Sequence, residues 1–448
     1  MSRPESARGT GTLTYLTKRF PRLSETFILD EIIGLEQAGL PLRLVSIADP
    51  GEPLRQERTG RVRSAVTYLH RPGGVWAKAA SWSGMAWALV AMAVRRPRAF
   101  ATALTGLGDR ESVSTAAKHL LEAASLARAA ERSGSRHIHA AFAHSPAAIA
   151  EIASTLIGVP FSFAAHAKDL YLSNPANLAH RIEKAAFVMV CSASARDALL
   201  QVASAHLGAE RSAGLAGRVL LQYHGVDIER FAPSAAAERA SAGPVILAVG
   251  RLVPKKGYPV LVDALAELAA KGVDFRCRVV GGGGMREELE ARIRSVGLAD
   301  RVELLGARTQ EEVREEYSKA DLFVQSSVVV EGGDRDGVPN SVLEALATGL
   351  AVVGTDVAGI PEVLLDGKTG LVVPAGDPSA LATAIGSLLC DPELRARIGG
   401  AGREKVEREL ARDECSRAVA QRFWELAFAA GAPAGRAAVE TQAALEAI

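Results

Sequence analysis

Between residues 245 and 374 the sequence alternates short apolar runs with longer amphipathic runs in one unbroken series. Short apolar runs are typical of buried strands, and apolar residues spaced three and four apart are typical of helices. Such an alternation predicts a parallel sheet covered by helices on both faces. The predicted strands are 245–251, 276–280, 301–306, 321–327, 351–356 and 370–374, and the predicted helices are 258–272, 285–297, 311–320 and 341–349.

The first half of the chain shows a looser alternation of the same kind, so a second α/β domain is expected there. Its strands are predicted near 12–16, 42–47, 137–142, 161–165 and 186–191, and its helices near 24–38, 113–132, 145–156 and 194–204. The segment PSAAAERASAGP, residues 233–244, has no apolar period and is interpreted as a linker. At 448 residues the chain is too long for one ordinary core, which agrees with two domains.

These patterns predict two Rossmann-like, doubly wound domains that face each other across a cleft, because such sheets bind ligands outside the carboxyl ends of their strands. The first domain is expected over 1–232 and the second over 245–411. One more helix within 412–430 is expected to pack back on the first domain. Residues 431–448 are rich in Ala, Gly and Pro, and a mobile tail is predicted there.

The overall charge excludes one class of function. Lys and Arg number 52 against 51 Asp and Glu, so the formal net charge is only +1. A protein that binds nucleic acid through a large basic field is therefore not expected. Four cysteines form no CxxC pair, and the first residues, MSRPESARGTGT, have no apolar core, so reduced thiols, no secretory signal and a cytoplasmic location are predicted.

An uncharged segment, SWSGMAWALVAMAV at 81–94, is followed by the basic run RRPR at 95–98. Its 14 residues are fewer than the ~20 that span a bilayer. The favoured interpretation is a helix buried between the domains. The alternative is a helix over 76–98 on the cytoplasmic face of the membrane, with its basic end on anionic headgroups. Three tryptophans suit either interpretation: Trp76, Trp82 and Trp87.

The loop after the first strand of the second series carries three cations, Arg251, Lys255 and Lys256, beside Gly250 and Gly257. Cations at the carboxyl end of a strand, just before a helix, are suited to a phosphate group. Arg251 and Lys256 are interpreted as such a site. Lys255 is interpreted as a solvated surface lysine.

The segment VEGGDRDGVPNSVLEALATG, residues 330–349, places acids and glycines before an apolar helix. Glu344 falls off the apolar face of that helix and is expected to point into the cleft. The amides of Gly337, Val338 and Asn340 lead into the helix and can meet negative charge as it develops. The acids of this segment would then accept hydrogen bonds from neutral hydroxyl groups beside that charge.

Three stretches of the second half resemble the retaining nucleotide-sugar glycosyltransferases of family 4, which have the GT-B fold. They are GRLVPKKG, the run from GVPNSVLEALATG to LVVPAGD, and YHGVDIERFAP. In the first half, FPRLSETFILDEI at 20–32, HIHAAFAHSPAAIA at 137–150 and FSFAAHAKDLY at 161–171 are similar to a bacterial subgroup that builds exopolysaccharides, including colanic-acid-type enzymes.

The resemblance implies roles for particular residues. Arg251 and Lys256 would hold the donor's diphosphate, and Glu344 would accept hydrogen bonds from the ribose. Asp336 stands where the family's paired-glutamate motif has its first Glu, and His166 matches the histidine that contacts the sugar near the reacting carbon. Further donor contacts are implied for Gly250, Arg308, Gly337, Val338, Pro339, Asn340 and Ser341. Ser24, Glu25, Thr26 and His144 would face donor or acceptor from the first domain.

The resemblance therefore implies an enzyme that transfers a sugar, with retained configuration, from a nucleotide-diphosphate donor to a glycan or polyprenyl-linked glycan. Two departures are noted: Asp336 is one methylene shorter than Glu, and the family's Gly-Gly turn is replaced by residues 19–23. No metal and no cofactor are expected, because Arg251 and Lys256 can neutralise the diphosphate. The DRD at 334–336, which imitates a metal-binding DxD, is interpreted as a coincidence.

Two other functions remain as alternatives. A non-catalytic nucleotide-sugar sensor would bind donor without turnover, and both Asp336 and the missing Gly-Gly turn motivate this alternative. A nicotinamide dehydrogenase would use VGGGGM, residues 280–285, but this run fails the full GxGxxG spacing. His137, His139 and His144 are spaced like a metal cluster, yet a core or acceptor-side role is predicted for them.

Overall fold

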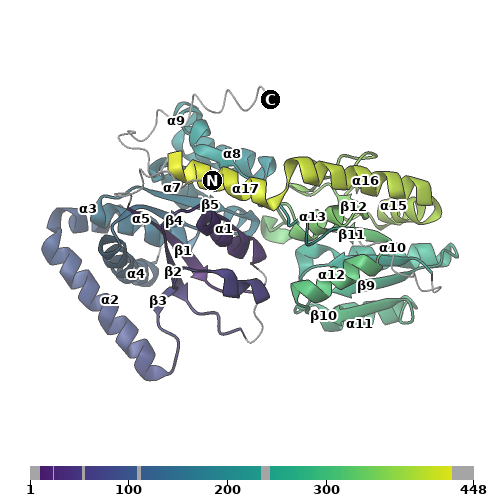
Figure 1. Ribbon diagram of the computed structural model, residues 1–448, viewed down its shortest axis with the longest axis horizontal. Helices are drawn as coiled ribbons and strands as arrows, with labels where there is room; N and C mark the ends of the chain where they lie inside the picture. Colours follow the sequence, from purple (N-terminus) through teal and green to yellow (C-terminus); the bar gives the residue numbers. More distant parts are fainter. Residues whose placement is uncertain (1–10, 24, 53–55, 108–111, 234–242, 426–448) are drawn as a thin grey trace. The chain divides into compact units, whose positions relative to one another are not determined.

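The computed structural model describes residues 11–23, 25–52, 56–107, 112–233 and 243–425 (Figure 1). The chain divides into two compact units, and each is described by itself. The first unit holds the residues up to Val190, 196–222 and those from Ser416 on; the second holds Cys191–Ala195 and Tyr223–Cys415. Most of the predicted linker 233–244, and all of 431–448, lie outside the described residues.

The first unit is built on a seven-stranded parallel sheet with the order β3-β2-β1-β4-β5-β6-β7. Its strands are β1 Thr12–Arg19, β2 Leu42–Ala48, β3 Thr67–His70, β4 Ser135–Ala140, β5 Phe161–Ala165, β6 Val188–Val190 and β7 Val219–Leu221. The helices that follow these strands are α1 Thr26–Gln37, α2 Val75–Arg95, α3 Pro97–Leu107, α4 Val113–Arg132, α5 Ser145–Ile157, α6 Ala167–Tyr171, α7 Pro175–Lys184, α8 Ala193–Leu207 and α9 Ala209–Leu215.

The second unit is built on a six-stranded parallel sheet with the order β10-β9-β8-β11-β12-β13. Its strands are β8 Val245–Val249, β9 Arg276–Val280, β10 Val302–Gly306, β11 Leu322–Gln325, β12 Ala351–Thr355 and β13 Leu371–Val373. The helices are α10 Tyr258–Ala270, α11 Arg286–Ser295, α12 Gln310–Lys319, α13 Asn340–Ala347, α14 Ile360–Val363, α15 Pro378–Cys390 and α16 Pro392–Glu409, and α17 Arg412–Phe423 follows them. The predicted class, two parallel α/β sheets, is confirmed.

In both sheets the strand order reverses beside the first strand. In the first unit β1 lies between β2 and β4, and in the second β8 lies between β9 and β11. Successive crossovers leave such a point in opposite directions, and the loops after the two central strands open a crevice at their carboxyl ends. Any site built on this fold is therefore expected after β1 and β4, and after β8 and β11.

The core of the first unit contains two histidines on β4. His137 and His139 are fully buried, and both rings lie against the Ser162 hydroxyl, at 2.8 Å from His137 Nε2 and 2.7 Å from His139 Nδ1. Phe187 stacks on His137 at 5.4 Å, and Phe423 of α17 meets His139 edge-on at 4.9 Å. The two rings are thus part of the core, as predicted.

His137 gives the first unit a testable response to pH. Burial lowers the pKa of His137 to about 3, against 6.5 in an unfolded chain. Below pH 6.5 His137 therefore becomes protonated in the unfolded chain but stays neutral in the folded core. The free energy of unfolding consequently decreases as the pH falls. As the pH falls below 6.5, we expect the free energy of unfolding of wild type to decrease relative to that of His137→Gln by about 1.4 kcal/mol per pH unit.

The measurement is urea unfolding followed by tryptophan fluorescence between pH 7.5 and 4.5. The four tryptophans lie at 76, 82, 87 and 424, so this signal reports on the first unit. Groups shared by both proteins, such as Glu31, cancel in the difference. The exposed His206, replaced by Gln, controls for loss of an imidazole as such. A constant difference across the pH range would show that His137 is not excluded from protonation in the folded protein.

The prediction that 81–94 is buried between domains is wrong. These residues belong to α2, which packs one narrow face on α4 and exposes the rest (Figure 1). The buried face consists of Ser81, Met85, Ala88 and Met92. Among the described helices, none has the length and apolar character required to cross a bilayer.

Candidate functional site

The loop after β8 places three cations at the point where the second sheet reverses. The Arg251 side chain is exposed, and within the described part of the chain it makes no hydrogen bond or ion pair. Lys256, in contrast, forms an ion pair. Its ammonium nitrogen lies 2.8 Å from Oδ2 of Asp336, a residue in the loop after β11. The fold therefore joins two loops that are 80 residues apart in the sequence.

Lys255 is not the surface lysine that the sequence predicted. Only 6% of it is exposed, and its ammonium donates to Asp334 Oδ1 at 3.0 Å and to the Arg335 carbonyl at 3.1 Å. It also lies 3.8 Å from Asp336 Oδ1. Burying the ammonium of Lys255 requires these partners, because a buried charge without a partner is strongly unfavourable. Lys255 thus fixes the turn that carries Asp336.

Asp336 is almost fully buried between cations. Its Oδ2 accepts hydrogen bonds from Lys256 and, at 2.6 Å, from the Ser327 hydroxyl. Burial alone would raise the pKa of Asp336, but Lys256, Ser327 and Lys255 together hold it below its usual range. The carboxylate is therefore ionised near neutral pH and acts as a hydrogen-bond acceptor.

Glu344 is more enclosed than its place off the apolar face of the helix suggested. It is 9% exposed, and every residue from Ser341 to Ala347 in α13 is buried. Tyr317 of α12 donates to Glu344 Oε2 at 3.0 Å, and the Gln310 amide lies 3.5 Å from Oε1. The helical spacing excluded Glu344 from one apolar face, but α12 covers the other side of α13.

A chain of polar side chains extends from α12 toward Asp336. The Tyr317 hydroxyl lies 3.0 Å from the Ser341 carbonyl oxygen, and the Ser341 hydroxyl donates to Gln325 Oε1 at 3.1 Å. The Gln325 amide then donates to the Ser327 hydroxyl at 2.8 Å, and Ser327 donates to Asp336. Sequence reasoning missed Tyr317, Gln325 and Ser327. The polar ending QSS of an otherwise apolar strand was the available signal.

Two glycines allow the backbone of the site to close. Gly257 has φ +63°, and a Cβ there would lie 1.8 Å from the Ser326 carbonyl oxygen. Gly281, after β9, has φ +153°, and a Cβ there would lie 1.8 Å from the Gly250 carbonyl oxygen. The glycine run of VGGGGM therefore packs on the loop of Gly250 and Arg251, which explains it without a bound dinucleotide.

The remaining predicted donor residues lie at the same carboxyl edge of the second sheet. Gly250 follows β8, and its carbonyl accepts from the Tyr258 hydroxyl at 2.9 Å. Arg308 is exposed and follows β10. Gly337 and Val338 lead to Pro339, the N-cap of α13, and Asn340 and Ser341 begin that helix. The site thus combines two cations, two buried carboxylates and a helix N-terminus, which favours negative charge.

In the first unit, the predicted residues gather after β1, β4 and β5, which are neighbours in the sheet. His166 N-caps α6, and its Nε2 donates to the Ala141 carbonyl oxygen at 3.1 Å. Burial lowers the pKa of His166 to about 4, so the ring is neutral at pH 7. His144 N-caps α5, and burial lowers its pKa to about 3. Both are therefore neutral rings rather than cations.

The loop after β1 is tied by ion pairs. Glu25 precedes α1 and accepts from Arg22 at 3.0 Å, and Arg22 also meets Glu52 at 3.2 Å. Thr26 is the first residue of α1, and Ser24 lies outside the described residues. Glu25 is thus held by a cation of its own loop.

Asp169 was not predicted, yet it connects two loops of this edge. Its carboxylate accepts from the Ala143 amide at 2.5 Å and from the His166 amide at 2.9 Å. Burial raises the pKa of Asp169 to about 7, although these amides lower it. The loop before His144 and the loop of His166 are therefore positioned by one buried carboxyl group.

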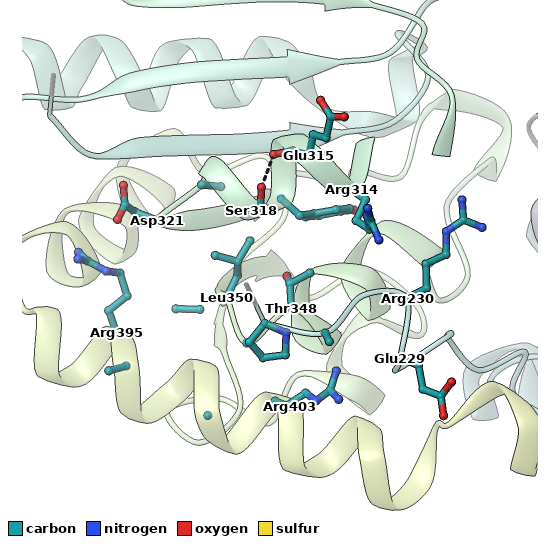
Figure 2. Close-up of a pocket in the computed structure, with 18 of the residues that line it drawn as sticks. Glu229, Arg230, Arg314, Glu315, Ser318, Asp321, Thr348, Leu350, Arg395 and Arg403 are labelled. Atoms are coloured by element: carbon teal, nitrogen blue, oxygen red, sulfur yellow. Dashed lines mark hydrogen bonds between the residues drawn. The ribbon is translucent and has the colours of Figure 1, made fainter. Parts of the chain in front are cut away.

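A cavity of about 770 Å³ lies elsewhere in the second unit, at the amino ends of β11 and β12 (Figure 2). Its lining includes Arg314 of α12, Asp321 just before β11, Leu350 just before β12, and Arg395 and Arg403 of α16. Open parallel sheets bind their ligands at the carboxyl ends of the strands. This cavity is therefore separate from the candidate site, despite its size.

Comparison with known proteins identifies a family for the second half of the chain. Residues 233–405 match the family "Glycosyl transferases group 1". One relative is the GDP-mannose-dependent alpha-(1-6)-phosphatidylinositol monomannoside mannosyltransferase of Mycolicibacterium smegmatis, to which the chain is 40% identical over 187 residues. The aligned region covers 40% of this chain and 49% of that protein. It is 35% identical over 205 residues to the putative colanic acid biosynthesis glycosyltransferase WcaL of Escherichia coli, covering 45% and 50%. The chain thus spans about half the length of the curated relatives it matches.

Solved structures with the same fold cover nearly the whole chain. HepE of Anabaena, in complex with UDP, superposes with a TM-score of 0.68 at 18% identity, covering 92% of this chain and all of that one. Sucrose-phosphate synthase from Thermosynechococcus elongatus gives 0.68 at 19%, covering 93% and 99%. At this identity the likeness shows the fold, and the family model shows the relationship. Residues 233–405 thus match the group 1 glycosyltransferases, family 4, and the chain has the GT-B fold.

Proposed function

We propose that this protein transfers a sugar from a nucleotide-diphosphate donor to a glycan or polyprenyl-linked glycan, with retention of the anomeric configuration. One observation carries the proposal. Arg251 and Lys256 lie at the reversal point of the second sheet, and Lys256 is held against the buried carboxylate of Asp336. A cationic pair next to a buried acceptor is suited to a sugar diphosphate.

The leaving group explains the cations. When the bond between sugar and diphosphate breaks, negative charge builds up on the phosphate oxygen and must be met there. The exposed guanidinium of Arg251 can form two parallel hydrogen bonds to phosphate. The ammonium of Lys256 has three donors, so it can keep Asp336 and still bind a phosphate oxygen. Each charge-assisted bond contributes about 1.5–3 kcal/mol.

The two buried carboxylates are proposed to accept hydrogen bonds from neutral hydroxyl groups of the donor. Asp336 would accept from a hydroxyl of the donor sugar, and Glu344 from the ribose. Both are positioned by the polar side chains around them, so their orientation is set before the donor arrives. Asp336 is one methylene shorter than the family's Glu, so the sugar must approach the loop after β11 more closely.

We further propose that no metal ion takes part. The DRD carboxylates, Asp334 and Asp336, both face lysine ammonium groups, at 3.0 Å from Lys255 and 2.8 Å from Lys256. A metal cation binds to carboxylates whose negative charge is not already balanced by another group. Here the two lysine ammonium groups balance the charge of both carboxylates. Arg251 and Lys256 would neutralise the diphosphate in place of a metal.

The class of acceptor is supported by the relatives. Their names connect them with colanic acid and with phosphatidylinositol mannosides. For this chain we propose an acceptor in the synthesis of exopolysaccharide or cell-surface polysaccharide on the cytoplasmic side of the membrane. The neutral rings of His166 and His144 would contact sugar hydroxyls from the first unit.

The test is a thermal-shift screen against UDP-, GDP- and ADP-sugars, each with and without EDTA. A donor present at 100 times its dissociation constant should stabilise the protein by about 2.7 kcal/mol. We expect one nucleotide class to raise the melting temperature, and EDTA to leave that increase unchanged. An increase abolished by EDTA would contradict the metal-free site.

No shift with any sugar nucleotide would contradict the donor site altogether. Binding followed by release of the nucleoside diphosphate in the presence of a glycan acceptor would support the enzyme. Binding without turnover for every acceptor would instead favour a nucleotide-sugar sensor.

A further inference from the structure

The exposed apolar side chains of this protein are concentrated on one helical hairpin. Twelve large apolar residues are exposed in the described part of the chain, and seven of them lie on α2 and α3. Those seven are Val75, Trp76, Trp82, Trp87, Val90, Val94 and Leu104. Scattered exposed apolar residues are ordinary, but a contiguous group marks a surface that binds another protein or a membrane.

The apolar residues of α2 form a stripe opposite its buried face. Positions 76, 87, 90 and 94 share one side of a helix with 3.6 residues per turn. Their exposures are 89% for Trp76, 59% for Trp87, 63% for Val90 and 75% for Val94. Ser83 is the polar residue in this stripe, and no charged residue lies in it. Surface helices usually carry charged residues on such a face, so the stripe is unusual.

The hairpin also carries charge of one sign only. Residues 75–107 contain no Asp and no Glu, but they contain Lys78, Arg95, Arg96 and Arg98. One acid from α4, Glu131, pairs with Arg96 at 2.9 Å and lies 3.8 Å from Arg95, whose side chain stays 68% exposed. The three arginines therefore lie at one end of the apolar stripe, and their charge is only partly neutralised.

An arginine of α4 adds to this surface. The Arg128 guanidinium carbon lies 3.9 Å above the ring of Trp87. This cation–π contact orients the indole while its outer side remains exposed. Tryptophan and arginine side by side are typical of surfaces that lie at the level of lipid headgroups.

We infer that the face formed by α2 and α3 docks on the surface of a membrane that contains anionic phospholipid. The stripe of Trp76, Trp87, Val90 and Val94 enters the boundary between headgroups and acyl chains, and Arg95, Arg96 and Arg98 contact the phosphates. The helix lies in the plane of the surface and does not cross it. This inference stands independently of the proposed activity, because it uses no residue of the donor site.

Charge argues for lipid rather than a second copy of the chain. In a twofold dimer each surface meets the same surface of its partner. Two copies of this hairpin would bring cations together without a new acid, because residues 75–107 contain none and the nearby Glu131 is already paired with Arg96. An anionic bilayer instead supplies phosphate to the arginines and an apolar layer to the tryptophans.

The experiment is co-sedimentation of the full chain with vesicles of phosphatidylcholine, alone or mixed with phosphatidylglycerol. We expect binding to the mixed vesicles, at least about tenfold weaker binding to phosphatidylcholine alone, and weakening by salt, because exposed charges are screened. Trp76→Ser combined with Val90→Ser should also lose about tenfold in affinity, and so should Arg95→Glu combined with Arg96→Glu.

The matched control is Val296→Ser, another of the twelve exposed apolar residues, which caps the carboxyl end of α11 in the second unit. It should bind mixed vesicles like wild type. Trp76 and Val90 are mostly exposed, so their replacement should preserve the fold, and circular dichroism with the melting temperature checks this. No binding to mixed vesicles, or equal binding by wild type and the Trp76/Val90 variant, would overturn the inference. A dimer in solution that the same variant abolishes would assign the face to a second copy instead.

Discussion

Arg251→Ala is expected to lower kcat/KM by about 100- to 1,000-fold, the usual cost of removing one donor to a developing negative charge. The loss should appear mainly in kcat, since the charge on the leaving oxygen is larger in the transition state than in the bound donor. The fold should be unaffected, because the side chain is exposed and makes no hydrogen bond or ion pair within the described residues. Steady-state kinetics with the donor found in the thermal-shift screen measures both constants.

Two further variants make the Arg251 result specific. Arg251→Lys keeps the charge but loses the planar fork, so its rate should lie between those of wild type and Arg251→Ala. Arg314→Ala removes another exposed arginine from the same unit, at the amino ends of the strands, and should keep wild-type kinetics. Wild-type rates for Arg251→Ala would remove this residue from the leaving-group site.

Asp336→Asn is expected to destabilise the second unit by about 3–5 kcal/mol, as is usual when one partner of a buried ion pair is removed. The amide cannot neutralise Lys256, whose side chain is 11% exposed. At about 2–4 °C per kcal/mol, the melting transition of this unit should fall by about 6–20 °C. Differential scanning calorimetry is the suitable method, because the tryptophans all lie in the first unit.

Two neighbouring substitutions provide the comparison for Asp336→Asn. Asp334→Asn should cost less, because the Asp334 side chain is 23% exposed and the Arg335 carbonyl still accepts from Lys255. Asp336→Glu retains the charge and should recover most of the stability, while its longer reach should change the affinity for the donor sugar. Equal melting temperatures for wild type and Asp336→Asn would show that Lys256 does not depend on this carboxylate.

The fold was predictable because its signals are local. Strands such as 245–251 and 161–165 are short apolar runs, and the helices between them carry a clear period, so the observed elements begin and end within a few residues of the predicted ones. The parallel class follows from the alternation itself. Arg251, Lys256 and Asp336 could be named because they lie in the loops that follow two strands and match a family motif.

The errors arose where a residue's environment comes from distant parts of the chain. Lys255 is buried by Asp334 and Arg335, 79 and 80 residues away, and no local pattern distinguishes it from a solvated lysine. Glu344 is covered by Tyr317 of α12, whose placement over α13 is a tertiary feature. The helix at 81–94 is apolar enough for a core, and only the packing of α2 on α4 shows which face remains exposed.

The most direct test is a crystal structure of the protein with a bound nucleotide diphosphate. The diphosphate should lie within hydrogen-bonding distance of the Arg251 guanidinium and the Lys256 ammonium, with the amides of Gly337 and Val338 directed at it. A diphosphate bound elsewhere, or bound while Arg251 points away into solvent and Lys256 contacts Asp336 alone, would contradict the account.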